Sequence, residues 1–532
     1  MISLRHRNRA RLLVLLALFT AGSPVAAQLF SRGNTRLESP DDSKDFGTVM
    51  IRGDFNGDFR SDLAAGAQET SIAGFAGAGE VLVWLASPLT GGLVDPPARF
   101  AQGLDGLPGT PAANEAFGAA LATGDFNGDG YDDLAVEVRG EDVAVDAGTA
   151  IDAGAVEVIY GSASGLTTAG AQIFDQESAG IADVAQTDDH FGRALVAADF
   201  DFDSFDDLAI GGRDKDVGSL VDAGAVWILH GSASGLSGVG SEFFDEAAAG
   251  GTLTTGNRFG EVLAATDFNH DGKADLVVGV PQESVNGHAA AGAVWILSGG
   301  FPTMTLPGFR LVQGGALAPG TLPGSADAGD LFGSSLAIGD FNVPIEGSAY
   351  IPDLAVGAVG ENDHAGAVTF VAGGPFGLTS TGAVQFMAAD LGTPGTALFF
   401  GFALASGTLH SRFRDDLIVG SILDPVSGQP GAGRTYIIRG TASGLDLASA
   451  RAWSAAFAGS ACGPAVEDGN FGYSLASGNF ARFGYTDLAI GVPGFAPAES
   501  GPPAGAIQLL FSALFAADFE TADLAQWSTS AP

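Results

Sequence analysis

The 532-residue chain carries 62 acidic and 23 basic residues, and its net charge of −39 argues against nucleic acid or anionic membranes as partners. Hydrophobic residues make up 46% of the chain, which favours a folded protein over a disordered one. The 80 glycines follow no collagen period. Together with abundant Val, Ile, Leu and Phe, they indicate many short strands joined by tight turns.

Residues 1–27 have the pattern of a secretory signal peptide. Its charged region holds Arg5, Arg7, Arg9 and Arg11. An apolar run from Leu12 to Leu18 follows, and Val25–Ala27 offers a small-residue cleavage site. A membrane anchor is the alternative, but the run is shorter than the ~20 residues of a spanning helix. We expect cleavage near Gln28, no integral membrane span afterwards, and a secreted, cell-surface or periplasmic protein.

A Phe-Gly pair recurs along the rest of the chain. The pairs begin at Phe46, Phe117, Phe191, Phe259, Phe332, Phe400 and Phe471, with spacings between 68 and 74 residues. Such self-similarity is the signature of a repeat architecture. It divides residues 28–514 into seven repeats and leaves residues 515–532 as a C-terminal tail. The tail is either a packing strand or a surface-association signal.

Each repeat contains four strand candidates in the same order. In the second repeat, the apolar segment Ala120–Ala122 precedes an aspartate-rich loop, and Leu134–Val136 follows that loop. A Gly-Ala-Val segment and an outer segment, Ala171–Phe174, complete the repeat. These segments are too short and too glycine-bounded for helices. Seven four-stranded repeats predict an all-β, seven-bladed β-propeller.

The two ends of the repeat region favour a closed ring over a linear solenoid. A solenoid needs atypical capping repeats, whereas the first and last repeats here are ordinary. The last repeat ends after its strand at Gly505–Leu510, and Gln28–Ser31 stands where other repeats have the outer strand of the preceding blade. We expect the N-terminal strand to complete blade seven.

Phe-Gly, an aspartate-rich hairpin and Gly-Ala in this order resemble the FG-GAP repeat of integrin α-subunits and of many secreted bacterial proteins. The resemblance covers residues 28–514. It implies a seven-bladed propeller with calcium ions in the loops between the first and second strands of a blade.

Four of the seven loops have the pattern Asp-x-Asn/Asp-x-Asp-x-x-x-Asp. The first loop holds Asp54, Asn56, Asp58 and Asp62, and the second holds Asp125, Asn127, Asp129 and Asp133. The third holds Asp199, Asp201, Asp203 and Asp207, and the fourth holds Asp267, Asn269, Asp271 and Asp275. At the seventh place, a backbone carbonyl is available from Arg60, Tyr131, Phe205 or Lys273. A glycine at the sixth place, Gly130 or Gly272, permits a sharp turn.

This donor set predicts about four Ca²⁺ ions, one in each of blades one to four. Calcium takes six to eight hard oxygen ligands in a flexible cage, whereas Mg²⁺ resists an all-protein cage. An EF-hand is the rival interpretation, but it needs a bidentate glutamate at position twelve and flanking helices. These loops close with aspartate at position nine and continue directly into Leu-Ala-Val strands.

Blades five to seven have lost the pattern. In blade five, Asp353 lies thirteen residues after Asp340 instead of eight. Blade six has Thr408, His410 and Arg412 at the ligand positions, and blade seven has Asn479, Ala481 and Phe483. Their closing residues, Asp416 and Asp487, remain as candidate turn caps. We expect no calcium in these blades.

No catalytic motif stands out. The Gly-Ser-Ala-Ser-Gly segments place Ala163 and Ala233 where a nucleophile elbow needs serine. The histidines are scattered without metalloprotease spacing, and the single cysteine, Cys462, has no partner motif. We therefore expect a protein without enzymatic activity, and we interpret Cys462 as a buried thiol.

The expected function is a monomeric, calcium-stabilised scaffold for adhesion or protein interaction, with an extracellular protein or glycan ligand. A lectin-like propeller is the alternative, and a hydrolase-associated propeller is a third class. The segments Glu137–Asp152 and Gly211–Asp222 vary most between repeats and are expected opposite the aspartate loops. They are either a ligand-binding face or mere insertions.

Overall fold

The structure of the protein is a computed structural model. It describes residues 34–38, 45–87, 92–146, 148–300, 303–342, 350–392, 398–456, 465–481, 486–495 and 505–511. The predicted signal peptide, the predicted C-terminal tail and Cys462 lie outside the described residues. No helix in the described ranges is long and apolar enough to cross a membrane.

Within these ranges the chain forms seven antiparallel four-stranded sheets, as predicted. Blade one contains β2 (Met50–Gly53), β3 (Asp62–Ala67), β4 (Glu80–Trp84) and β7 (Ala98–Phe100). Blade two contains β8 (Phe117–Gly124), β9 (Asp133–Val138), β12 (Ala155–Tyr160) and β13 (Thr167–Phe174). Blade three contains β14 (Ala194–Ala198), β15 (Asp207–Gly212), β16 (Ala225–His230) and β17 (Ser237–Phe244). Blade four contains β18 (Val262–Thr266), β19 (Asp275–Val280), β20 (Ala293–Ser298) and β21 (Thr305–Leu311).

The remaining blades follow the same order. Blade five contains β24 (Phe332–Gly339), β25 (Asp353–Ala358), β26 (Ala367–Gly374) and β27 (Gly377–Phe386). Blade six contains β28 (Phe400–Gly407), β29 (Asp416–Ser421), β30 (Arg434–Thr441) and β31 (Gly444–Trp453). Blade seven contains β32 (Leu475–Gly478), β33 (Asp487–Val492), β34 (Ala506–Leu510) and β1 (Asn34–Glu38).

Short elements decorate the connections between these strands. The hairpins are β5 (Ala86–Ser87) with β6 (Gly92–Leu93), β10 (Val143–Val145) with β11 (Gly148–Ala150), and β22 (Ala316–Leu317) with β23 (Gly320–Thr321). The helical turns are α2 (Glu361–His364) and η1 (Ala388–Leu391).

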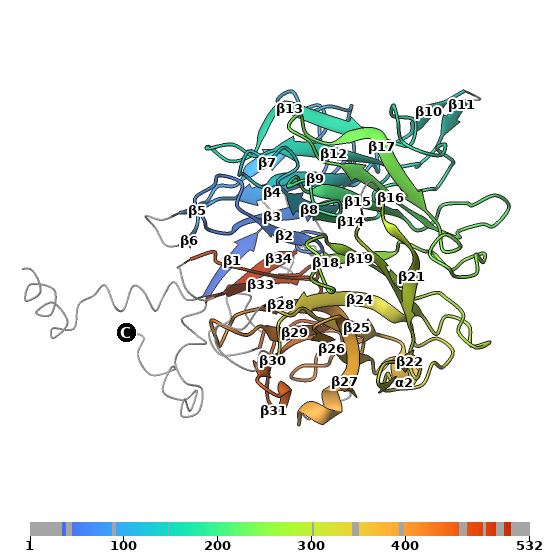
Figure 1. Ribbon diagram of the computed structural model, residues 1–532. Coiled ribbons are helices and arrows are strands. Elements are labelled where there is room, and N and C mark those ends of the chain that lie inside the picture. Colours follow the sequence, from blue (N-terminus) through green and yellow to red (C-terminus); the bar gives the residue numbers. More distant parts are fainter. Residues whose placement is uncertain are drawn as a thin grey trace, which may run out of the picture.

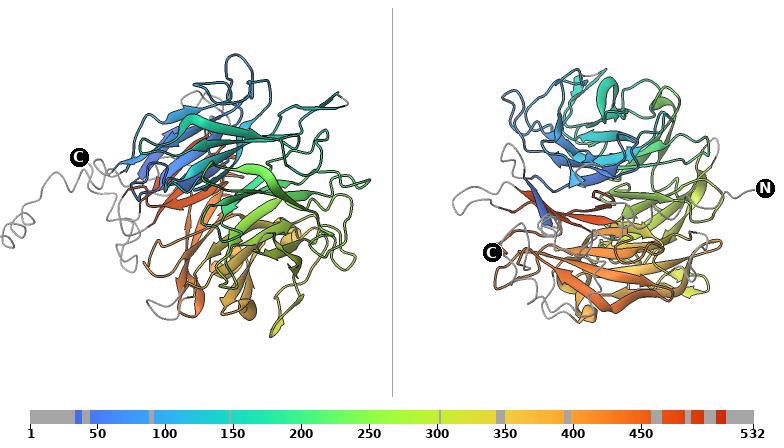
Figure 2. Two further views of the ribbon diagram at one scale, coloured as in Figure 1. Left: turned by 45° about the horizontal axis from the view of Figure 1, so that its top comes forward. Right: turned by 90° about the vertical axis from the view of Figure 1, so that its left-hand side faces the viewer.

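The ring is closed by pairing between the two ends of the repeat region. Strand β1 pairs antiparallel with β34, from Asn34 opposite Leu510 to Glu38 opposite Ala506. The closing strand therefore lies a few residues beyond Gln28–Ser31, which are not among the described residues. The first strand of every blade contacts the first strands of both neighbouring blades, including β32 with β2. Figures 1 and 2 show blade seven between blades one and six.

The Phe-Gly and Gly-Ala motifs meet at the junction between neighbouring blades. The phenylalanines of all seven Phe-Gly pairs are at most 1% exposed. Each lies against the glycine before the third strand of the preceding blade, as Phe191 does against Gly154. The Phe191 N–H also donates to the Ala153 carbonyl at 2.8 Å. At the closure, Gly505 of blade seven takes the same place against Phe46 of blade one.

Substituting a junction glycine tests this packing. Gly154→Ala is expected to destabilise the protein by roughly 2–4 kcal/mol, because Gly154 has a φ of +84° and an added Cβ would lie 2.6 Å from the Phe191 nitrogen. Gly170→Ala is the matched control, with the same φ but open space around the added atom. We expect it to cost only the left-handed strain, about 1–2 kcal/mol. Urea unfolding compares the two, and equal losses would contradict a tight junction.

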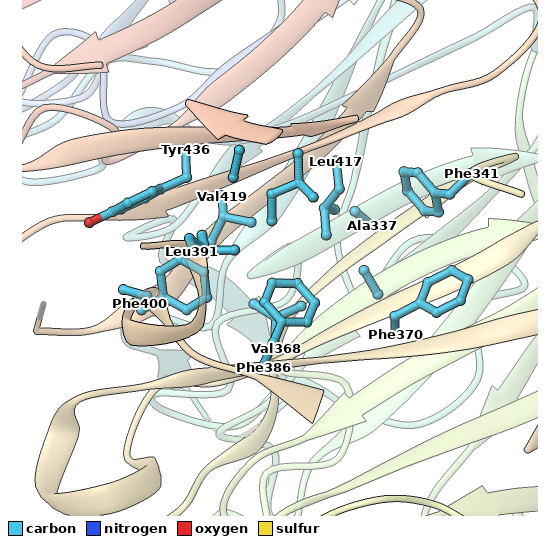
Figure 3. Packing of buried hydrophobic residues seen from close by; sticks show 14 of the residues in the cluster. Ala337, Phe341, Val368, Phe370, Phe386, Leu391, Phe400, Leu417, Val419 and Tyr436 are labelled. Carbon is cyan, nitrogen blue, oxygen red and sulfur yellow. The ribbon is translucent and has the colours of Figure 1, made fainter. Parts of the chain in front are cut away.

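Apolar side chains fill the space between adjacent blades. In Figure 3, Phe341 and Phe370 of blade five and Tyr436 of blade six belong to one buried cluster. Phe400, the Phe-Gly residue of blade six, packs edge-on against Phe386 and Tyr436 with ring centroids 6.0 and 5.3 Å apart. Each blade thus buries its faces against its neighbours.

Antiparallel pairing sends successive connections to alternate faces of the ring. The connections between first and second strands, residues 54–62, 125–133, 199–207 and 267–275, lie on one face, here called the acidic-loop face. The connections between second and third strands, including residues 139–154 and 213–224, lie on the other, here called the opposite face. The variable segments are therefore opposite the aspartate loops, as predicted.

Candidate metal centres

The first aspartate of each predicted loop organises the loop backbone. Counting it as position 1, its Oδ1 accepts the position-5 N–H at 2.9, 3.0, 3.2 and 3.2 Å in blades one to four. Its Oδ2 accepts the position-6 N–H at 2.7, 2.9, 3.0 and 2.9 Å. Four loops of different sequence therefore share one geometry. Their position-1 residues are Asp54, Asp125, Asp199 and Asp267.

Positions 3 and 5 extend the pattern. The position-5 carboxylates of Asp58, Asp129, Asp203 and Asp271 each accept the position-7 N–H at 2.9–3.1 Å. The position-3 amide oxygens of Asn56, Asn127 and Asn269 accept the position-5 N–H at 2.9–3.0 Å. A carboxylate has about four lone-pair sites, so these bonds leave acceptor capacity free for a cation.

Backbone at positions 4 and 6 turns the loop sharply. Both positions have positive φ in all four loops, including the non-glycine residues Phe59, Phe202, Ser204 and His270. Glycine at the sixth place was expected for Gly130 and Gly272, and both adopt this conformation. The left-handed conformation is therefore a property of the loop and not only of its glycines.

Blade three brings its acidic side chains closest together. Carboxylate oxygens of Asp199, Asp201 and Asp203 lie within 4.8 Å of one another. His230, at the end of β16, is a neighbour that the sequence did not indicate. Its Nδ1 is 3.3 Å from Asp207 Oδ1 and 3.8 Å from Asp201 Oδ2. The neighbouring carboxylates of Asp207 and Glu242 raise the pKa of His230 to about 10.

The closing aspartate, which stands at position 9 except in the longer loop of blade five, has the same role in blades with and without the acidic pattern. Its Oδ2 accepts a loop N–H at 2.8–3.1 Å in all seven blades. In blades one to six, its Oδ1 also accepts an N–H at or just beyond the end of the third strand, at 2.7–3.2 Å. The seven residues are Asp62, Asp133, Asp207, Asp275, Asp353, Asp416 and Asp487. The prediction of turn caps at Asp416 and Asp487 is confirmed by these bonds.

Burial governs the electrostatics of the closing aspartates. It raises the pKa of Asp62 and Asp133 to about 7 and that of Asp275 to about 6. Burial also raises the pKa of Asp353, in blade five, to about 7. Because blade five lacks the full acidic pattern, the shift belongs to the buried cap position. Keeping a buried closing aspartate ionised costs free energy unless a positive charge lies nearby.

The position-7 side chains connect neighbouring loops. Tyr131 lies against Gly57 of the preceding loop, and Phe205 lies against Gly128. Arg60 reaches back to blade seven and donates from Nη1 to the Ala481 carbonyl at 3.0 Å. Lys273 occupies the same position in blade four, where its N–H donates to Asp271 at 3.0 Å.

Position 8 carries acids whose role was not predicted. Asp132 and Asp206 accept the position-1 N–H of the preceding blade, at 2.7 and 2.9 Å. Asp415 does the same for Asp340 of blade five at 2.9 Å. Their own N–H groups donate back to the position-1 carbonyl at 2.9–3.1 Å. These aspartates therefore link one blade to the next through reciprocal hydrogen bonds.

In blades five and six, different side chains contact the closing aspartate. In blade five, the Asn342 amide donates to Asp353 at 2.8 Å. In blade six, His410 Nδ1 lies 2.8 Å from Asp416, whereas Arg412 is exposed. His410 therefore contacts the closing aspartate of blade six. Phe483 of blade seven is not among the described residues.

The FG-GAP repeat family matches residues 117–151, 191–229 and 259–297, in blades two, three and four. The chain contains FG-GAP repeats. Blades one, five, six and seven share with these FG-GAP repeats the buried Phe-Gly junction and the capping aspartate.

Several curated proteins are similar to part of this FG-GAP region. Rat integrin alpha-7 is 34% identical over 181 residues, which are 33% of this chain and 14% of that protein. Integrin alpha-PS5 of Drosophila melanogaster is 32% identical over 177 residues, 33% of this chain and 15% of that protein. Bovine phosphatidylinositol-glycan-specific phospholipase D is 32% identical over 167 residues, 31% of this chain and 18% of that protein. The chain thus resembles the integrin α propeller, but it spans less than a fifth of each relative.

Among solved structures, an exotype rhamnogalacturonan lyase aligns over 90% of this chain and 72% of its own, with 12% identity and a TM-score of 0.41. A likeness this weak supports no conclusion about function.

Proposed function

We propose that the loops of blades one to four each bind one calcium ion and that the ions stabilise the propeller. Side-chain oxygens at positions 1, 3, 5 and 9 and the carbonyl at position 7 are the proposed ligands. They belong to Asp54, Asn56, Asp58, Arg60 and Asp62; Asp125, Asn127, Asp129, Tyr131 and Asp133; Asp199, Asp201, Asp203, Phe205 and Asp207; and Asp267, Asn269, Asp271, Lys273 and Asp275.

One observation carries this proposal. In the described parts of the seven loops, every loop keeps the capping aspartate, but only four place additional oxygens at positions 1, 3 and 5 in a common geometry. Blade six forms its turn with Thr408, His410 and Arg412 at those positions. The turn can therefore form without the acids at positions 1, 3 and 5. All the ligands that these positions offer are oxygen atoms, which is the ligand type that Ca²⁺ prefers.

We further propose that the protein acts outside the cell as a non-enzymatic scaffold for protein interaction, with residues 1–27 directing export. Similarity to integrin alpha-7 and integrin alpha-PS5 supports an interaction role. The opposite face is the proposed binding surface, because it carries the variable segments on a rigid ring.

An array of matrix proteins and glycans, probed in 1 mM calcium (on the order of extracellular levels) and after chelation, tests the proposed interaction role. Binding to no protein under either condition would contradict it.

A second candidate, glycan recognition, is favoured by one pocket on the opposite face. It lies between blades three and four and has a volume of about 260 Å³. Its lining includes Glu246, Asn257, Glu283, Trp295 and Arg310. Asn257 donates to Glu246 at 2.6 Å, and Trp295 Nε1 donates to Glu283 at 3.1 Å. A concave site with converging polar groups suits a small polyhydroxylated ligand.

The same array separates the two candidates when an Asn257→Leu variant is included. Binding of a glycan by the native protein, lost in this variant, would favour glycan recognition. Protein binding that survives the substitution would favour the scaffold.

A further inference from the structure

Four arginines gather on the opposite face near the axis of the ring, in a chain with an excess of acids. This arginine cluster consists of Arg139, Arg193, Arg213 and Arg258. Arg139 follows β9 and Arg213 follows β15, while Arg193 directly precedes β14, the innermost strand of blade three. Gly192 N donates to the Gly211 carbonyl at 3.2 Å, so the start of β14 lies beside the end of β15.

Three members of the cluster are paired with carboxylates. Arg139 Nε is 3.3 Å from Glu137. Arg213 contacts Asp214 at 3.2 Å and Glu261 at 3.0 Å.

Arg258 contacts Asp214 at 3.3 Å and Asp222 at 4.0 Å. His190 Nδ1 lies 3.0 Å from the same Asp214. Asp214 is therefore shared among three cations, and Glu137, Glu261 and Asp222 each already contact one arginine.

Arg193 differs from the other three. Among the described residues, its guanidinium has no carboxylate within 4 Å and no hydrogen-bond partner. Burial lowers the pKa of Arg193, and Arg139 and Arg213 lower it further, whereas Glu137 and Glu261 act in the opposite direction. Leaving a half-buried cation without a partner, beside two like charges, costs free energy.

The repeats show that this cation is not required by the fold. The residue after Phe-Gly is Arg193 in blade three, but Ala119, Ser334, Phe402 and Tyr473 stand there in blades two, five, six and seven. All of these blades form the same inner strand contacts. An unpaired arginine at a position that tolerates alanine or serine points to a ligand.

We propose that Arg193, flanked by Arg139 and Arg213, binds a carboxylate group presented to the opposite face. Guanidinium and carboxylate match in a two-pronged, charge-assisted hydrogen bond. A monovalent anion fits because one guanidinium lacks a partner. The site goes beyond the calcium proposal and lies on the other face of the ring.

The carboxylate has two chemical sources, an acidic peptide side chain or a uronic acid of a glycan. The test titrates the full chain with tetraglutamate and with trigalacturonate by calorimetry, at fixed free calcium. Their uncharged counterparts, tetraglutamine and trigalactose, are the controls. Binding of one acid but not of its neutral counterpart supports the site and names the source. Binding of neither acid, or equal binding of acid and neutral forms, would overturn it.

Substitutions of Arg193 test whether the carboxylate binds at this residue. Arg193→Gln is expected to weaken it at least tenfold, Arg193→Lys to retain part of it, and Arg451→Gln, in the outer strand of blade six, to leave it unchanged. Unchanged affinity in Arg193→Gln would overturn the proposal.

Thermal stability gives a second readout. Because Arg193 has no partner in the folded protein, Arg193→Gln is expected to leave the melting temperature unchanged or raise it. A fall of several degrees would show that Arg193 is a structural residue and would contradict the site. Calcium content, measured on the same samples, is expected to stay constant, so failure here is distinguishable from failure of the calcium proposal.

Discussion

Chelation by EDTA is expected to lower the melting temperature by about 10 °C. Each site contributes about 2.7 kcal/mol when free calcium is one hundred times its Kd, so four sites contribute on the order of 11 kcal/mol. A chain of this size unfolds with an entropy of roughly 1 kcal/mol per kelvin, which converts that free energy into the expected shift. Differential scanning calorimetry in millimolar calcium and in EDTA measures it.

Magnesium provides the control for this experiment. We expect it to restore little of the lost stability, because Mg²⁺ dehydrates reluctantly and rarely accepts an all-protein cage. Superimposable melting curves in calcium and in EDTA would show that the acidic loops hold together without metal.

Removing a closing aspartate is expected to destabilise the protein whether or not its blade binds calcium. Asp416 accepts two backbone N–H groups, at 2.8 and 3.1 Å, and is fully buried. Asp416→Ala leaves both donors without a partner, at a cost of about 1–3 kcal/mol each. Urea unfolding is expected to show a loss of about 2–6 kcal/mol in calcium and in EDTA alike.

A matched substitution at position 5 is expected to destabilise the protein in calcium but hardly in EDTA. Asp129 is exposed and accepts only the Tyr131 N–H at 3.1 Å. Asp129→Ala should therefore cost stability in calcium, through weaker binding at one site, and little in EDTA. If both variants lost the same stability in EDTA, the distinction between cap and ligand positions would be wrong.

Much of the fold was readable from the sequence because the repeat is dictated by local geometry. Phe-Gly recurs because Phe191 and its equivalents fill the blade junction, and glycine recurs where a side chain would collide with that phenylalanine. The number of blades and the place of the loops follow from these motifs. The N-terminal strand was placed too early, since β1 carries no motif and is specified only by its pairing with β34.

The missed contributions to the site all depend on contacts between separate segments. Asp132 has no role in the sequence analysis, because its partner, the Asp54 N–H, belongs to another blade. His230 ends a strand 23 residues beyond Asp207, and only the hairpin brings its imidazole to within 3.3 Å of that carboxylate. Arg193 likewise gave no sequence signal, because an unpaired charge is recognised only once its neighbours are known. The proposal of positions 1, 3, 5 and 9 as ligands, in contrast, needs only the spacing within a loop.

Calcium content per chain, determined by mass spectrometry after equilibration in calcium and removal of free ions, tests the central proposal most directly. Four ions per chain are expected for the native protein and three for Asp129→Ala. Asp416→Ala should retain four, because blade six contributes no ligand set. A native protein that retains no calcium, or a content that Asp58→Ala, Asp129→Ala, Asp203→Ala and Asp271→Ala together leave unchanged, would contradict calcium binding by the loops of blades one to four.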